Sequence, residues 1–417
     1  MRSYTSKVTG WVLILIVFPF LSYSQKSPLY DSIISMIDSV VVAGIQNKAY
    51  PGAVLYVSQK DSVLVHRAYG THRYDSSRYN HTDDIFDLAS VTKVTAATLS
   101  LMKLYDNGLI DLDKSINEYV PGLGRSKFGQ ASIRSTLAHQ AGLRAWIPYW
   151  QDMKTDKGWK KRFFSDSPSE KHQIKITDSL YLTNKNYQYI KRQIRKTKVN
   201  PEQGYVYSGL FFYLIPELVE SLTGQDFETF LNQEFYQPLG ASTTGFNPLE
   251  RFDQNQIVPT EVDTFFRMEP IHGTVHDEGA ILMGGISGNA GLFSNAKDLA
   301  KVWSMFLQDG KVDTIQYLSP QTLDLFTTAQ FLGNRRGLGF DKPLVNYDKD
   351  KSSVAKAAGF RSYGHSGYTG PLVWADPDTD LLFIFLCNRV YPSRNQRMIY
   401  ELGIRPQLHE LVYQLIR

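Results

Sequence analysis

Cysteine is nearly absent from this chain of 417 residues, and its scarcity excludes several kinds of protein. Cys387 is the only cysteine, so neither an intrachain disulfide nor a cysteine-based zinc site can form. The segment Leu381–Cys387 is uniformly apolar, which indicates a buried strand with Cys387 as a small core residue. A chain of this length can bury a core large enough to be stable without disulfides.

The chain also lacks an apolar run long enough to predict a membrane-spanning helix. The run Trp11–Leu21 has eleven residues and contains a proline, whereas a spanning helix needs about 20. Basic residues precede this run and small residues follow it, which is the pattern of a secretory signal peptide. We predict a signal peptide at residues 1–24, one domain at 25–417, and export to the periplasm or the exterior. A retained membrane anchor is the alternative.

Charge is moderate, and nothing in it predicts a nucleic-acid partner. The formal net charge is +4, and loss of the leader would leave about +2. Residues 154–198 differ, because they hold thirteen Lys and Arg against four Asp and Glu, with aromatic residues interspersed. This segment could form a rim that attracts anionic cell-wall polymers or lipid head groups. We favour the alternative, a solvated insertion whose aromatic side chains pack onto the body of the protein.

The apolar periodicity predicts matching pieces of structure at the two ends of the mature chain. A helix and two strands open it at 30–47, 53–57 and 63–69, and three strands and a helix close it at 363–368, 372–375, 381–387 and 395–416. We therefore predict an α+β fold with an antiparallel sheet flanked by N- and C-terminal helices. The sheet part covers about 30–90 and 336–417, and a large, mostly helical subdomain covers about 91–335.

The spacing Ser-x-x-Lys occurs four times, and context selects one of the four as a candidate nucleophile. Ser90 follows the strand-like run at 85–89 and opens a helical pattern that ends at Asn107-Gly108. Ser100 lies in the middle of that helix, where its hydroxyl would bond back to the preceding turn. Ser294 is typical of a helix N-cap, and Ser353 lies in a polar loop. Ser90 is therefore our candidate.

Lys93 lies three residues after Ser90, and this spacing can activate a hydroxyl group. Residues at i and i+3 of a helix share one face, so the Lys93 amine can reach the Ser90 hydroxyl. A serine hydroxyl is a weak nucleophile and needs a neighbouring base, and burial makes a lysine such a base by disfavouring the ammonium form. A helix N-terminus can also stabilise developing negative charge through its free N–H groups.

Two later segments, at 201–209 and 364–370, complete a pattern that resembles a known family. The chain is similar to the serine β-lactamase and penicillin-binding-protein-like family, in the class C-like branch that also contains esterases and D-amino-acid peptidases. Ser90 and Lys93 match its Ser-x-x-Lys, Tyr207 matches the tyrosine of its Tyr-x-Asn, and the segment His365-Ser366-Gly367 matches its Lys/His-x-Gly. Segments 137–143 and 289–294 also resemble family motifs, and the resemblance covers about 30–415.

The resemblance implies a serine hydrolase that forms an acyl-enzyme on Ser90 and needs no metal or organic cofactor. Lys93 and Tyr207 would transfer the serine proton to the leaving group. Backbone N–H groups of Ser90 and Tyr368 would form the oxyanion hole. The remaining positions expected to bind substrate are His365, Ser366, Gly367 and Gly209. The implied partner is a small-molecule or peptidoglycan-derived substrate, cleaved by an esterase, D-amino-acid peptidase, carboxypeptidase or β-lactamase-like activity.

Gly209 departs from the pattern, because the family usually has Asn at the third position of Tyr-x-Asn. The missing amide would hold Lys93 and the substrate, and a lost hydrogen bond to a charged group costs about 1.5–3 kcal/mol. We therefore predict faster cleavage of activated esters than of β-lactams. A non-catalytic envelope or peptidoglycan-binding protein that keeps the fold is the alternative. His272, His276 and Asp277 do not predict a metal site, since a glycine between the histidines breaks helical spacing.

Overall fold

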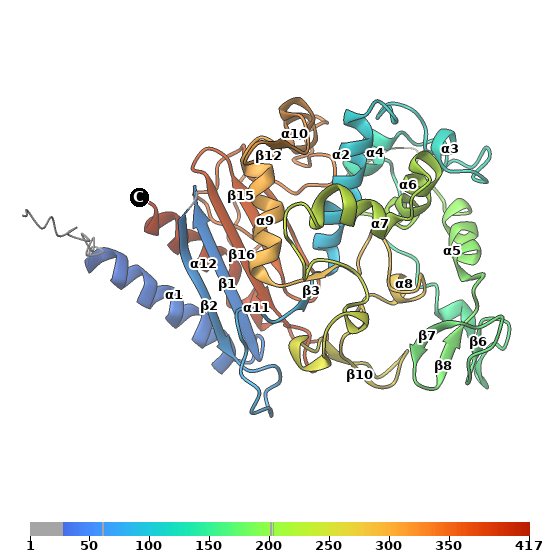
Figure 1. Cartoon of the computed structure of the whole chain (residues 1–417), viewed down its shortest axis with the longest axis horizontal. Helices are drawn as coiled ribbons and strands as arrows, with labels where there is room; N and C mark the ends of the chain where they lie inside the picture. Colours follow the sequence, from blue (N-terminus) through green and yellow to red (C-terminus); the bar gives the residue numbers. More distant parts are fainter. Residues whose placement is uncertain (1–27, 61, 201, 203) are drawn as a thin grey trace, which may run out of the picture.

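The computed structural model describes residues 28–417 except 61, 201 and 203, so the predicted signal peptide lies outside the described residues. Its central feature is a five-stranded antiparallel sheet in the order β14-β15-β16-β1-β2 (Figure 1). The strands come from the two ends of the chain: β1 (Gly52–Gln59), β2 (Ser62–Gly70), β14 (Tyr363–Ser366), β15 (Leu372–Asp376) and β16 (Leu381–Cys387). The pairing of β1 with β16 joins the two ends, with Leu55 opposite Phe385.

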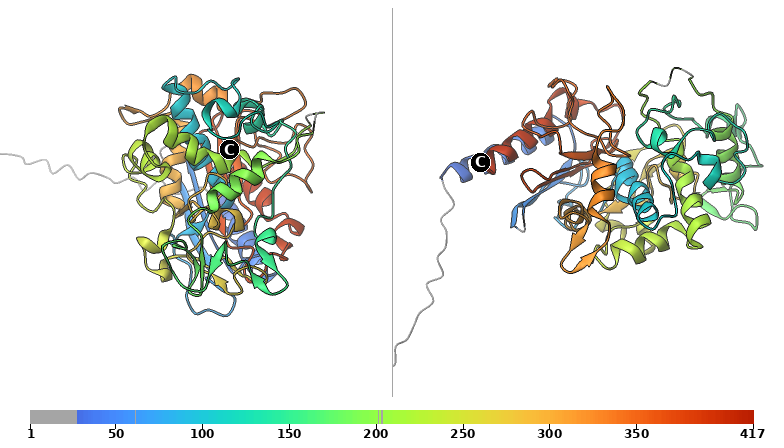
Figure 2. Two further views of the ribbon diagram at one scale, coloured as in Figure 1. Left: turned by 90° about the vertical axis from the view of Figure 1, so that its right-hand side faces the viewer. Right: turned by 90° about the horizontal axis from the view of Figure 1, so that it is seen from above.

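Terminal helices cover one face of this sheet, as the sequence predicts. The helix α1 (Pro28–Gln46) lies beside α12 (Ile404–Leu415), and both pack at the outer end of the molecule (Figure 2). By length and composition α1 could cross a membrane, but Ile37 and Val41 are fully buried in the core beneath it. The expectation of one continuous C-terminal helix was wrong. Gly403, at φ 58°, separates α11 (Met398–Glu401) from α12.

Alternation along the strands creates two cores, one on each face of the sheet. Leu55 and Phe383 point toward α1 and α12. Tyr56 and Ile384, their neighbours in sequence, point toward the rest of the molecule, where α9 (Ala296–Leu307) crosses the sheet. Successive side chains of a strand face opposite sides, so uniformly apolar strands such as β16 are buried on both faces. This architecture confirms the predicted fold class.

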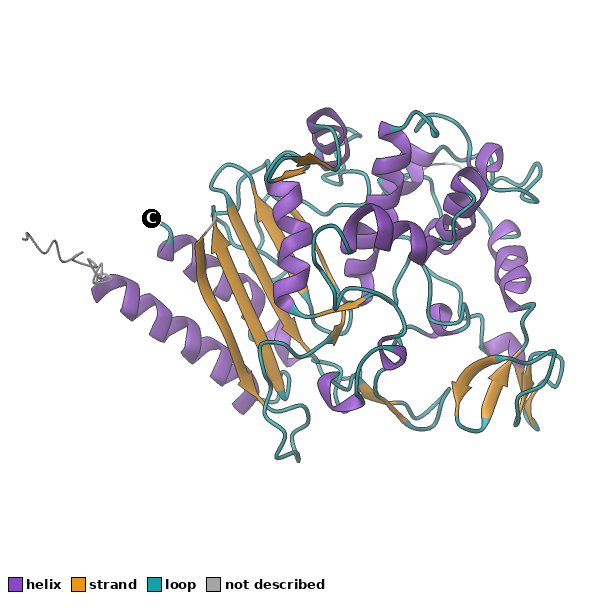
Figure 3. Cartoon of the chain, in the orientation of Figure 1, coloured by secondary structure: helices purple, strands orange, loops and turns teal. Residues whose placement is uncertain are grey.

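The middle of the chain forms a mostly helical region beside the sheet (Figure 3). The sequence did not predict the short strands that this region also contains, chiefly the three-stranded sheet β6-β8-β7. Its helices are α2 (Leu99–Asp106), α3 (Ile116–Tyr119), α4 (Ile133–Leu137), α5 (Asn186–Arg195), α6 (Ile215–Thr223), α7 (Phe227–Leu231), α8 (Glu278–Ile281), α9 and α10 (Pro320–Thr327). Its short strands include β3 (Phe86–Asp87), β4 (Lys154–Thr155), β5 (Gly158–Trp159), β6 (Phe164–Ser165), β7 (Ile174–Thr177), β8 (Leu180–Leu182), β9 (Glu261–Val262), β10 (Pro270–Ile271), β11 (Phe293–Ser294), β12 (Lys311–Val312) and β13 (Ile315–Gln316).

The basic segment 154–198 forms β4 to β8 and α5, and its aromatic side chains pack inward. The Trp159 ring lies 4.7 Å from Phe164 and 5.4 Å from Phe266, which belongs to the body of the protein. Phe163 contacts Tyr189 in the same way, at 4.8 Å. The aromatic residues therefore anchor this segment, in agreement with the interpretation that we favoured.

Candidate active site

The backbone turns sharply just before Ser90, where β3 gives way to a helix. Ala89 has a φ of 45°, a left-handed conformation that is unusual for a residue with a side chain. The buried Asp87 carboxylate holds this turn, because it accepts hydrogen bonds from the Ala89 N–H and the His276 N–H, both at 2.7 Å. Burial raises the pKa of Asp87. The strained turn places Ser90 at the start of the helix and at the edge of a cavity.

The tight helical turn after Ala89 aligns Lys93 with Ser90. Residues 89–91 form a 3₁₀ turn and Lys93–Thr98 a π-helical turn, which leads into α2. Residues three apart nearly superimpose in a 3₁₀ turn, and π-helical turns are common at functional sites. The Lys93 Nζ donates to the Ser90 Oγ at 3.1 Å. The structure therefore brings together the two residues that the sequence paired.

Lys93 is buried without a counterion among the described residues. Lys93 is only 3% exposed, and its Nζ also donates to the main-chain oxygen of Asn289 at 2.8 Å. The rings of Tyr207 and Phe212 lie 5.5 and 5.4 Å from the Nζ. Carbonyl, hydroxyl and aromatic groups therefore surround the Lys93 Nζ, and no carboxylate of the described residues pairs with it.

The other three Ser-x-x-Lys serines have structural roles or lie in a loop. The Ser100 hydroxyl donates to the Ala96 carbonyl at 3.0 Å, as predicted for a mid-helix serine. The expectation that Ser294 caps α9 was wrong by one residue. Asn295 is the N-cap and accepts from the Asp298 N–H, while Ser294 lies in β11 and donates to the Asn295 carbonyl. Ser353 lies in a loop.

Tyr207 lies beside Lys93 with its hydroxyl group buried and free of hydrogen bonds in the described part of the chain. His139 fixes the backbone on both sides of it. The Val206 N–H donates to the His139 carbonyl at 3.0 Å, and the Ser208 N–H donates to the His139 Nδ1 at 3.1 Å. The two rings are 4.6 Å apart. Burial and the nearby Arg336 lower the pKa of His139 well below its usual range, so the ring is neutral.

His365 on β14 is a neutral residue, and the positive charge at this position comes from Arg336. The His365 Nδ1 donates to the Ser366 carbonyl at 2.8 Å, and burial with Arg336 and Lys93 lowers the pKa of His365 to about 3. The Arg336 guanidinium lies 3.4 Å from the His365 Nε2 and 5.1 Å from the centre of the Tyr207 ring. Asp341, at 3.3 Å, balances part of its charge. Sequence reasoning missed Arg336, and its only signal was a pair of arginines in a loop.

The segment after β14 lies directly against the turn that carries Ser90. A Cβ atom on Gly367 would lie 2.6 Å from the Leu88 carbonyl oxygen, so only glycine fits there. The Thr369 hydroxyl donates to the Asp87 carbonyl at 2.9 Å. Among the described contacts, neither the Ser90 N–H nor the Tyr368 N–H donates to another group of the protein. Both predicted oxyanion-hole donors are thus free, on segments that touch.

Gly209 leaves open space beside Lys93. A Cβ atom built on it would lie 3.9 Å from the Asn289 Cβ and 4.0 Å from the Lys93 Cε, both ordinary contacts. The amide of Asn289 does not replace the missing one, because its Nδ2 donates to Tyr213 and Asp277 and its Oδ1 accepts from Ser287. The Asn289 main-chain oxygen instead holds the lysine.

These groups line a cavity of about 410 Å³. Ser90, Lys93, Tyr207, Gly209 and Tyr368 all contribute to it. One wall is apolar and comes from 145–150, and a charged end comes from His276, Asp277, Glu278 and Arg394. The His276 Nε2 contacts a Glu261 carboxylate oxygen at 2.7 Å, and the His272 Nε2 contacts the Ile257 carbonyl at 2.7 Å. Among the described residues no three side chains of metal-ligating type gather at one point.

A family model named Beta-lactamase matches residues 37–403. The chain belongs to the Beta-lactamase family. Curated relatives include a putative D-alanyl-D-alanine carboxypeptidase of Escherichia coli K12, 29% identical over 86% of this chain and 83% of the relative. An N-acetylmuramyl-L-alanine amidase of Bacillus subtilis is 31% identical over 85% of this chain and 79% of the relative. The chain is thus a Beta-lactamase-family serine hydrolase.

Solved structures share the fold of this chain. The octameric penicillin-binding protein homologue of Pyrococcus abyssi superposes with a TM-score of 0.64 at 16% identity, over 88% of this chain and 76% of that one. EstCE1, described as a hydrolase with promiscuous acyltransferase activity, gives 0.63 at 19% identity over 92% and 100%. At these identities the similarity extends to the fold alone.

Proposed function

We propose that this protein is an exported serine hydrolase that forms an acyl-enzyme on Ser90 and cleaves an ester or amide of a peptidoglycan-derived molecule. The observation that carries the proposal is the 3.1 Å contact between the Lys93 Nζ and the Ser90 Oγ at the edge of a cavity. A nucleophile within hydrogen-bond distance of a base is the signature of covalent catalysis.

Lys93 and Tyr207 would move the protons. A neutral Lys93 amine accepts the Ser90 proton while the Ser90 Oγ bonds to the substrate carbonyl carbon, and the N–H groups of Ser90 and Tyr368 stabilise the resulting oxyanion. The proton then passes, through the free Tyr207 hydroxyl, to the leaving oxygen or nitrogen, and the bond to that atom breaks. Water attacks the Ser90 ester, gives its proton to the same pair, and releases the acid and the free serine.

A buried positive charge beside the cavity and the apolar wall of the cavity support a substrate with a carboxylate and apolar groups. Arg336 places a buried positive charge beside Tyr207, and the aromatic wall at 145–150 provides apolar contact. Two relatives have names that specify alanine-containing substrates, a carboxypeptidase for D-alanyl-D-alanine and an amidase for N-acetylmuramyl-L-alanine. We extend this substrate class to the present chain.

A fluorophosphonate probe and intact-mass measurement test the proposal. The protein should gain one label, which peptide mapping should place on Ser90. Ser90→Ala should abolish the label, whereas the matched control Ser100→Ala should keep it. Lys93→Met should slow labelling by orders of magnitude, because the hydroxyl then lacks its base. A label that persists in Ser90→Ala would refute the assignment.

The same experiment distinguishes an enzyme from the alternative, a non-catalytic envelope-binding protein. The absence of the family's asparagine at position 209 favours that alternative. A binding protein would show no label and no turnover but would sediment with purified peptidoglycan. Export has its own measurement: a mature N terminus near residue 25, found by mass spectrometry of the periplasmic or secreted fraction.

A further inference from the structure

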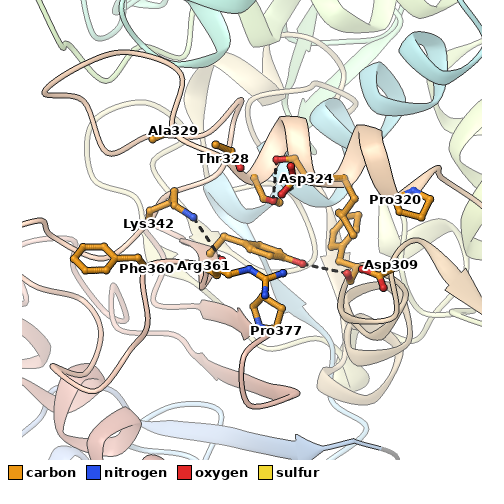
Figure 4. A pocket seen from close by; sticks show the side chains of 13 residues that line it. Asp309, Pro320, Asp324, Thr328, Ala329, Lys342, Phe360, Arg361 and Pro377 are labelled. Atoms are coloured by element: carbon orange, nitrogen blue, oxygen red, sulfur yellow. Dashed lines mark hydrogen bonds between the residues drawn. The ribbon is translucent and has the colours of Figure 1, made fainter.

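A further cavity, of about 350 Å³, lies where the first residue of β14 meets α9 and α10 (Figure 4). None of its lining residues lines the cavity at Ser90. The residues come from the C-terminal end of α9, from α10, from the segment that enters β14 and from the turn between β15 and β16: Phe306, Asp309, Pro320, Leu323, Asp324, Thr327, Thr328, Ala329, Lys342, Phe360, Arg361, Tyr363 and Pro377. A cavity of this size can hold a small molecule.

Lys342 brings an ammonium group to this cavity without a carboxylate partner in the described part of the chain. Its Nζ donates only to two main-chain carbonyls, those of Arg361 at 3.5 Å and Ser362 at 3.3 Å, and both contacts are long. Burial and the neighbouring Arg361 lower the pKa of Lys342 to about 8. A recessed ammonium with poor partners would gain from an anionic ligand group.

Two carboxylates, Asp309 and Asp324, face the same cavity. Neither forms an ion pair among the described residues, although Lys342 lines the same space. In Figure 4, Lys342 lies on one side of the opening and Asp309 on the other, with Asp324 between them. The second cation, Arg361, is already paired with Asp378 at 3.0 Å outside the cavity. The free charges are therefore separated by sign.

Apolar side chains also line this cavity. Phe306 and Leu323 are buried and form part of the wall, while Phe360 stands 73% exposed at the cavity. With Arg361 paired outside the cavity, one cation, Lys342, and two carboxylates, Asp309 and Asp324, remain for a ligand, so unpaired charges of both signs line the cavity. A purely anionic or cationic ligand would leave one set of charges without a partner, whereas a zwitterion with an apolar body would engage both.

We propose that this cavity binds a free amino acid or short peptide, with its carboxylate on Lys342, its ammonium group on Asp309 and Asp324, and an apolar side chain against Phe306, Leu323 and Phe360. The proposal does not rest on the function assigned to Ser90, because the two cavities share no residue.

Isothermal titration calorimetry with alanyl-phenylalanine, in its L,L and D,D forms, tests the proposal on the mature protein. The same dipeptides with an acetylated amine or an amidated carboxylate remove one charge at a time. We expect Lys342→Met to weaken binding of the free dipeptide about tenfold and to leave the affinity for the amidated dipeptide unchanged. Asp324→Asn should weaken binding of the free dipeptide by a smaller factor, about threefold, since an exposed carboxylate contributes less to an ion pair. The affinity for the acetylated dipeptide should not change.

Two controls keep the result interpretable. Lys342→Arg should restore binding, and Lys356→Met, which removes an exposed lysine in the same segment, should have no effect. Melting temperatures of all variants show whether each one folds. Equal affinity for the free, acetylated and amidated dipeptides would overturn the proposal, as would binding that Lys342→Met does not change. If the fluorophosphonate probe failed to label Ser90 in the unaltered protein, the proposed function would be refuted, but dipeptide binding at this cavity would still stand.

Discussion

Gly209→Asn restores the amide that the family pattern places beside Lys93, and the structure allows it. The backbone of Gly209 is not left-handed, and an added Cβ atom would make contacts of 3.9 and 4.0 Å. Lys93 has two acceptors, the Ser90 hydroxyl and the Asn289 carbonyl, which leaves it room for another partner. The substitution therefore tests chemistry rather than packing.

The expected gain follows from a hydrogen bond to a charged or strongly polar group. Such a bond contributes about 1.5–3 kcal/mol, or roughly 10- to 150-fold in rate. The asparagine side chain helps most when the substrate itself contains an amide group, because the hydrogen bond between the two amides can then stabilise the transition state. We expect a gain near the lower end of this range, since the Asn289 carbonyl already orients Lys93.

The assay compares kcat/KM for nitrophenyl acetate, an activated ester, with that for the cephalosporin nitrocefin. The unaltered protein should cleave the ester faster, and Gly209→Asn should raise cephalosporin cleavage about tenfold while changing ester cleavage little. Gly209→Ala is the matched control, because it adds the Cβ atom without the amide and should change neither rate.

Equal loss of both activities in Gly209→Asn and Gly209→Ala, with an unchanged melting temperature, would refute the reasoning. That result would mean that the open space beside Lys93 is occupied by substrate and not by the missing side chain. A lower melting temperature in Gly209→Asn but not in Gly209→Ala would show that the new asparagine amide is buried without a hydrogen-bond partner. That result would also contradict the open space described beside Lys93.

Two further predictions concern buried charges. Arg336→Met should raise the pKa of His365 from about 3 toward its ordinary value, measured by NMR, because a neighbouring cation is lost, and it should raise KM for carboxylate-bearing substrates more than for neutral esters. His409→Gln should make the protein less sensitive to acid. Burial lowers the pKa of His409 to about 3, so on acidification the unfolded chain takes up a proton at this position before the folded chain does. The neutral His409 therefore costs no stability above pH ~6.5, and the free energy of unfolding falls as the pH drops below that value. At pH 5 the loss from His409 is about 2 kcal/mol, and urea unfolding at pH 7 and pH 5 should show a smaller difference in the variant.

The sheet was predictable because its strands leave a simple signature. The strands β1, β15 and β16 are buried on both faces, so each is a short apolar run bounded by turns. The small strands of the basic segment were not predictable, because strands of two to four residues carry too little periodicity. The break at Gly403 was missed for a similar reason, since one glycine within an apolar helical pattern is often tolerated.

The site divides in the same way between local and distant features. The placement of Lys93 over Ser90 follows from one helical turn and could be predicted from spacing. Arg336 and His139 could not, because their roles depend on loops that meet Tyr207 only in the folded chain. The left-handed Ala89 was also hidden, since the side chain that holds the turn, Asp87, forms one of its two bonds to a residue 189 positions away.

The arrangement of Arg336 explains how a histidine can replace lysine on β14 without loss of positive charge from the site. A lysine at 365 would carry its charge on the strand itself, where it would lie close to the Arg336 guanidinium that now contacts His365 at 3.4 Å. Like charges at that distance repel, so one cation excludes the other. Asp341 fixes the choice, because it pairs with Arg336 and its main chain bonds to Gly364 of β14. The positive charge beside β14 is therefore set by the loop at 335–341, and under the proposed function we expect substrate preference to change with that loop rather than with the strand.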